Sequence, residues 1–152
     1  MNVRRAGARR ASTISGYFRD ADAALPFIER YNPIAEGIYV TLQELNDAVH
    51  SRCPDDVREI GPDEGTTAND VVRLSMLLID VDPLRPRGVS ATDDEKAHAL
   101  SVAVALRDFL RKEGWPEPLI FADSGNGWHL IYRIDRPVED STLLQKVLQA
   151  LA

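Results

Sequence analysis

Cysteine and long hydrophobic runs are the scarcest features of this chain. Its 152 residues include a single cysteine, Cys53, so neither an internal disulfide nor a multi-cysteine zinc site can form. No apolar stretch approaches the roughly 20 residues that cross a bilayer. The first residues also lack the apolar core of a signal peptide. These absences predict a cytoplasmic protein that has no membrane partner.

Positive charge is also in short supply. The chain has 18 Lys and Arg against 24 Asp and Glu, a net charge of −6, which argues against a broad basic surface for nucleic acid. Residues 1–10 nevertheless hold four arginines and no acid. We predict a basic, disordered tail over residues 1–14, which could also touch a phosphate backbone. Residues 15–152 are long enough to bury the core of one domain.

Hydrophobic periodicity predicts an α/β (α+β) fold, a mixed sheet with helices packed on it. Strands are expected over 37–42, 71–81, 119–122 and from 128 to about 134, and helices over 20–31, 43–50, 92–113 and 141–151. Pro26 predicts a late start or a kink in the first helix. Thr92 and Glu95 match a capping box, and Gly114 marks the end of that helix. Residues 54–70 are expected to form a long loop with at most one short strand.

Two carboxylates end the most hydrophobic strand of the chain. Side chains alternate along a strand, so Asp80 and Asp82 should share one face, with Cα atoms roughly 6.5–7 Å apart. Two anions this close favour a divalent cation between them. The simpler alternative is a solvent-exposed pair at a strand exit, balanced by Arg85 and Arg87.

A glycine-rich turn between two apolar strands is the second notable stretch, over residues 124–129. Asn-Gly is a strong hairpin signal, so the glycines have a structural explanation. Glycines also let backbone N–H groups approach a phosphate. Such a site would contain, in chain order, Ser124, Gly125, Asn126, Gly127 and His129. His129 shares its strand face with Arg133, which could offset phosphate charge together with Arg85 or Arg87.

The hydrophobic-Asp-x-Asp of residues 78–82 and the Ser-Gly-Asn-Gly-Trp-His of residues 124–129 together resemble the first two motifs of the archaeo-eukaryotic primase superfamily. The chain is most similar to the primase-polymerase domains of phage and mobile-element replication proteins. The likeness runs from about residue 16 to residue 137 and includes the linking sequence DPLRPRGVSATDDEKAHAL.

This resemblance implies both a fold and a chemistry. It implies an RRM-like primase-polymerase core in which Asp80 and Asp82 hold Mg²⁺ or Mn²⁺, while Ser124 and His129 contact the incoming nucleotide. The implied catalytic set is Asp80, Asp82 and His129. The implied reaction is template-directed nucleotidyl transfer by two metals, which is primer synthesis in DNA replication. Its partners would be nucleoside triphosphates, a DNA template or primer, and a helicase domain or partner.

One departure from the family pattern leaves alternatives open. A third acidic motif is expected well downstream of His129, and Asp135 follows too closely to fill that role. The chain is then either a fragment of a longer replication protein, truncated before this motif, or a non-catalytic nucleotide- or DNA-binding remnant. A glycosyltransferase with a D-x-D metal site is a third reading, which explains the aspartates but not the histidine hairpin.

Overall fold

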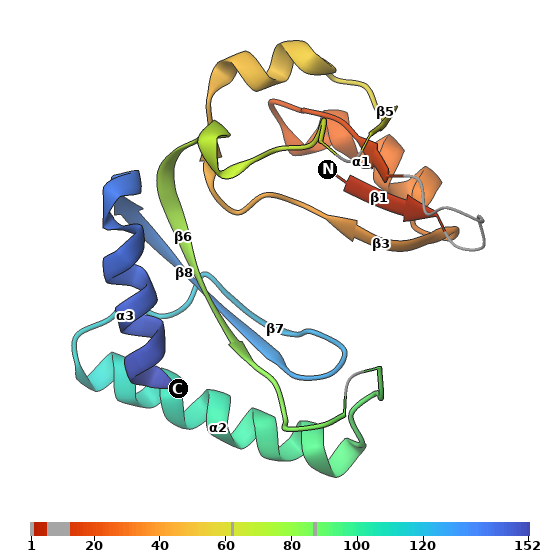
Figure 1. Ribbon diagram of the computed structural model, residues 1–152. Helices are drawn as coiled ribbons and strands as arrows, with labels where there is room; N and C mark the ends of the chain where they lie inside the picture. The colour runs from red at the N-terminus through yellow and green to blue at the C-terminus, as the bar shows by residue number, and fades with distance from the viewer. Residues whose placement is uncertain (1, 6–12, 62, 87) are drawn as a thin grey trace. The chain divides into compact units, whose positions relative to one another are not determined.

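The computed structural model of the chain describes residues 2–5, 13–61, 63–86 and 88–152 (Figure 1). The chain divides into two compact units, Met1–Arg73 and Leu74–Ala152. The α/β class with helices packed on a sheet is confirmed. Among the described helices, none is long and apolar enough to cross a membrane.

The first unit is built on an antiparallel sheet with the strand order β3-β1-β2-β5. Its strands are β1 (Asn2–Arg5), β2 (Thr13–Ser15), β3 (Ala35–Tyr39) and β5 (Arg58–Ile60). The prediction of a disordered tail over residues 1–14 is therefore wrong for 2–5 and 13–14, whose backbones pair in the sheet; its remaining positions lie outside the described residues. Ile14 and Tyr31 form the centre of a small core with α1 (Ala21–Tyr31).

Local capping explains where the first unit departs from its predicted elements. Asp20 accepts a hydrogen bond from the Ala23 N–H at 2.8 Å and so begins α1 well before Pro26, which lies inside the helix. The predicted helix over 43–50 is wrong. It is replaced by β4 (Glu44–Leu45) and a 3₁₀ helix, η1 (Asp47–Arg52), because the Asn46 side chain caps the Ala48 N–H.

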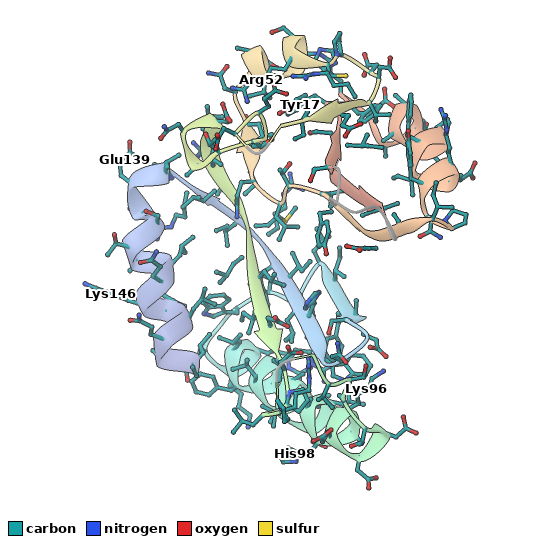
Figure 2. The ribbon with its side chains drawn as sticks, turned by 45° about the vertical axis from the view of Figure 1, so that its right-hand side comes forward. Tyr17, Arg52, Lys96, His98, Glu139 and Lys146 are labelled. Carbon is teal, nitrogen blue, oxygen red and sulfur yellow. The ribbon has the colours of Figure 1, made fainter. Side chains whose placement is uncertain are left out.

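A partly buried ion pair holds the loop that precedes the long strand. The Arg52 guanidinium (Figure 2) donates to both carboxylate oxygens of Asp70, at 2.6 and 3.0 Å. Asp70 is 8% exposed and also accepts from Thr67, in the 3₁₀ turn η2 (Ala68–Asp70). The hydrogen bond from Arg52 and then that from the Thr67 backbone lower the pKa of Asp70 to about 2.

Because the pKa of Asp70 is lower in the folded chain than in the unfolded chain, the contribution of Asp70 to stability should depend on pH. The stabilisation is present above the usual Asp pKa of 3.8 and is lost as the pH falls through about 2. We expect Asp70→Asn to lower stability at neutral pH and to flatten the fall in stability below pH 4. Urea unfolding followed by circular dichroism across this range measures both effects. Asp47→Asn, in an exposed ion pair with Arg19, should keep the pH dependence of the wild type.

The second unit has a split β-α-β arrangement. Its elements are β6 (Val71–Val81, which begins in the first unit and pairs there with β4), α2 (Asp93–Lys112), β7 (Ile120–Asp123), β8 (Trp128–Arg136), the 3₁₀ turn η3 (Val138–Asp140) and α3 (Ser141–Leu151). Strand β8 lies between β6 and β7 and is antiparallel to both, so β6 and β7 run parallel. Helices α2 and α3 lie on the same side of this sheet (Figure 1).

Strand alternation decides which face of this sheet is the core. Leu77 and Ile79 of β6, with Leu130 and Tyr132 of β8, pack against Ala103 and Leu110 of α2 and against the apolar side of α3. The residues between them, including Asp80 and His129, therefore belong to the face away from the helices. The predicted α2 is confirmed, with its capping box at Thr92 and Glu95 and with Gly114 in a left-handed conformation just beyond its end. The sheet thus packs one face against α2 and α3, and Asp80 and His129 lie on the opposite face.

The buried hydroxyl of Tyr132 is an exception within this core. Tyr132 is 1% exposed, and its hydroxyl oxygen has no hydrogen-bond partner among the described residues. Burial raises the pKa of this phenol. Because an unsatisfied buried hydroxyl costs free energy, we expect Tyr132→Phe to leave stability unchanged or to raise it by about 1 kcal/mol. Urea unfolding followed by tryptophan fluorescence tests this, since Trp115 packs edge-on against the Tyr132 ring.

Candidate functional site

The pairing register of β6 and β8 places Asp80 directly opposite His129. His129 Nε2 lies 3.3 Å from Asp80 Oδ1, an ion-pair distance when the imidazole is protonated. The side chains are 36% and 52% exposed, so both can reach a ligand. This pairing could not be read from the sequence, because 48 intervening residues separate the two positions and only the register joins them.

The neighbours of this pair on the same sheet face follow from the same register. Ala122 of β7 continues the row beyond His129. The adjacent row contains Leu78, Ile131 and Ile120, all apolar. The acid and the imidazole therefore border an apolar strip, of which Ile120 is 45% exposed.

Asp82 lies just beyond the end of β6 and has different neighbours from Asp80. Its Oδ2 is 3.4 Å from a terminal nitrogen of Arg85, and its carboxylate is 46% exposed. It also lines an open hollow of about 510 Å³ with Asp94, Glu95 and His98 at the start of α2. No described interaction joins Asp82 to Asp80 or His129. The two aspartates of the predicted pair therefore have different partners, Arg85 for Asp82 and His129 for Asp80.

The hairpin turn between β7 and β8 presses against the end of β6. A Cβ atom at Gly127 would lie 2.5 Å from Asp82 Oδ1 and would collide with the Val81 carbonyl oxygen, so only glycine fits there. The predicted hairpin is confirmed, but Gly125, with φ of 94°, supplies its left-handed residue instead of the Asn-Gly pair. The turn and the second aspartate are thus in direct contact.

Hydrogen bonds within the turn occupy several of the groups that were predicted to bind phosphate. The Gly125 N–H donates to Asp123 Oδ1 at 2.7 Å, and the Gly127 N–H donates to Ser124 Oγ at 2.9 Å. Asn126 Oδ1 accepts from the Ala91 N–H at 3.0 Å, which ties the turn to the loop before α2. The Ser124 hydroxyl keeps its own hydrogen for donation.

Sequence reasoning missed the residues that anchor this turn to α2. Lys96 (Figure 2) donates to Asp123 Oδ2 at 2.8 Å, and its carbonyl oxygen accepts from the indole N–H of Trp128 at 3.3 Å. The hydrogen bond from Lys96 and then that from the Gly125 backbone lower the pKa of Asp123. An Asp two residues before a glycine is a known turn signal and could have identified Asp123. The helix partner could not be identified in this way.

The remaining predicted residues lie further from the Asp80–His129 pair. Arg133 is on the same face of β8, about 13 Å further along the strand at the usual rise per residue. Asp135 follows two residues later, so it is still more distant from Asp80. Arg87 lies outside the described residues.

The oxygen ligands of this site suit a hard divalent cation, although they are few. In the described ranges, no three His, Cys, Asp or Glu side chains form a group that could hold a metal ion. Mg²⁺ is commonly bound by one or two carboxylates together with substrate phosphates and water. Asp80 and Asp82 fit that pattern of incomplete protein ligation. Comparisons of the chain with protein-family models, with curated proteins and with solved structures found no match, so the interpretation of this site rests on its residues and their geometry.

Proposed function

We propose that this chain is a primase-polymerase-like domain that binds a nucleoside triphosphate with a divalent cation for template-directed nucleotidyl transfer on DNA. The observation that carries the proposal is the direct pairing of Asp80 with His129 across two strands, beside a glycine turn that contacts Asp82. An acid pair suited to Mg²⁺ or Mn²⁺ and an imidazole suited to phosphate thereby meet at one end of one sheet.

Each side chain has a distinct task in this proposal. Asp80 and Asp82 would hold the cation, and charge neutralisation at the phosphates is the chemistry that a bound Mg²⁺ or Mn²⁺ supplies. His129, oriented by Asp80, donates a hydrogen bond to a phosphate oxygen. The Ser124 hydroxyl, which accepts from the Gly127 N–H, donates its hydrogen to the same nucleotide.

A binding domain without catalysis is the second candidate, and two observations favour it. The described residues contain no group of three His, Cys, Asp or Glu side chains that could hold a metal ion. The Gly125 and Gly127 N–H groups are already used within the turn, which limits a backbone cradle for phosphate. Both observations are compatible with nucleotide binding, but they argue against catalysis by this chain.

Titration of the full chain with a labelled nucleoside triphosphate, in Mn²⁺ and then in excess chelator, tests the proposal. We expect binding that requires the cation. Extension of a primed template under the same conditions would support polymerase activity, whereas binding without extension would support the non-catalytic candidate. Turnover of a sugar nucleotide without polymerisation would instead indicate a D-x-D glycosyltransferase, and absence of cation-dependent binding would contradict all of these.

A further inference from the structure

Arg85 is a largely buried guanidinium placed against one of the proposed metal ligands. Its side chain is 17% exposed, and one terminal nitrogen lies 3.4 Å from Asp82 Oδ2. The other terminal nitrogen donates to the Val89 carbonyl oxygen at 2.7 Å. Its Nε is buried and has no hydrogen-bond partner among the described residues. The guanidinium thus has one ionic contact, one backbone hydrogen bond and one unused buried donor.

The loop fixes Arg85 independently of Asp82. The Val89 N–H donates to the Pro86 carbonyl oxygen at 3.2 Å, and the Val89 carbonyl oxygen accepts from the guanidinium. Pro83 and Pro86 restrict the backbone on either side of Arg85. The positive charge is therefore held beside Asp82 by a contact that does not involve this carboxylate.

The surroundings of Asp82 are otherwise acidic. The same hollow is lined by Asp94, Glu95 and His98, and Asp80 is two residues away along the chain. Hydrogen bonds from the Thr92 backbone and hydroxyl, and also the charge of Arg85, hold the pKa of Glu95 below its usual range. The positive charge of Arg85 thus acts on two carboxylates near the end of β6, Asp82 and Glu95.

We propose that Arg85 is a built-in counter-ion of Asp82, which occupies this carboxylate when no metal is bound and weakens the affinity of the aspartate pair for a divalent cation. The inference rests on the proposed function, because it takes Asp80 and Asp82 as the metal ligands. Cation binding would then exchange one positive partner of Asp82 for another. Arg85 would thus set the metal affinity of the site through Asp82, without binding the metal itself.

The test measures Mn²⁺ affinity directly, by the electron paramagnetic resonance signal of the unbound ion, without any activity assay. Removing one positive charge a few ångströms from the ligand should tighten Mn²⁺ binding about five- to tenfold in Arg85→Gln. Arg85→Lys, which keeps the charge, should remain within about twofold of the wild type by the same reasoning. Arg111→Gln removes an equal charge from an exposed ion pair on α2 and should change nothing. Tryptophan fluorescence checks that each variant is folded.

The outcomes separate this inference from the proposed function. Mn²⁺ binding that is absent in the wild type, or that survives Asp80→Asn with Asp82→Asn, would contradict the proposed metal site itself. If binding needs the aspartates but Arg85→Gln matches Arg111→Gln or binds more weakly, only the counter-ion role is refuted. An Arg85→Lys variant that binds as tightly as Arg85→Gln would also refute it, because the charge would then be irrelevant.

Discussion

Replacement of Asp80 and Asp82 together by asparagine is expected to abolish cation-dependent triphosphate binding, with a loss of at least about a hundredfold in affinity. Asparagine keeps the shape of each side chain but removes the charge that attracts a divalent cation. Neither carboxylate belongs to the hydrophobic core, and both are about half exposed, so the fold should survive. Equilibrium titration with a labelled triphosphate in Mn²⁺ measures the loss.

A matched variant separates a site effect from a change in net charge. Glu29→Gln with Glu36→Gln also removes two negative charges, from exposed positions of the first unit, and should bind as the wild type does. The double asparagine variant also loses the pairs with Arg85 and His129, so urea unfolding must show that it is folded before its affinity is compared. If this folded variant still bound triphosphate with undiminished affinity, the two aspartates could not be the metal ligands.

Elements with strong local signals were predictable from the sequence. The capping box at Thr92 and the glycine at 114 fix both ends of α2 without help from tertiary contacts. Side-chain alternation along β6 and β8 likewise accounts for Leu77 with Ile79, and Leu130 with Tyr132, sharing the face that packs against the helices. In these segments local preference and burial point to the same structure.

The short elements and the candidate site depend on contacts with residues distant in sequence, which a local sequence pattern does not predict. The segment after β3 became a two-residue strand and a 3₁₀ helix because Asn46 caps it and β6 pairs with it. Strand β1 was predicted as part of a tail because its arginines give it no apolar strand pattern. Its strand conformation depends on pairing with β2 and β3. In the site, the motifs identified Asp80 and His129, but their contact and the pairing of Arg85 with Asp82 arise from register and loop geometry.

Gly127→Ala is the stability change with the largest expected effect in the second unit. The added methyl group would meet the Val81 carbonyl oxygen and Asp82 Oδ1, both attached to the end of β6, so the hairpin turn or the strand must move. Overpacking of this kind typically costs about 1–3 kcal/mol, and we expect a loss in that range. Urea unfolding followed by tryptophan fluorescence suits the measurement, since Trp115 and Trp128 both pack against the core of this unit.

Gly125→Ala in the same turn distinguishes crowding from backbone strain. Gly125 has a left-handed φ of 94°, but a Cβ there would meet nothing within 4 Å, so its substitution strains the backbone without pushing on β6. Both variants should lose stability, yet only Gly127→Ala should also weaken Mn²⁺ binding, because only it displaces the Asp82 carboxylate. Equal effects of the two on Mn²⁺ affinity would mean that the turn acts through its own conformation, and that its contact with the end of β6 does not position the second aspartate.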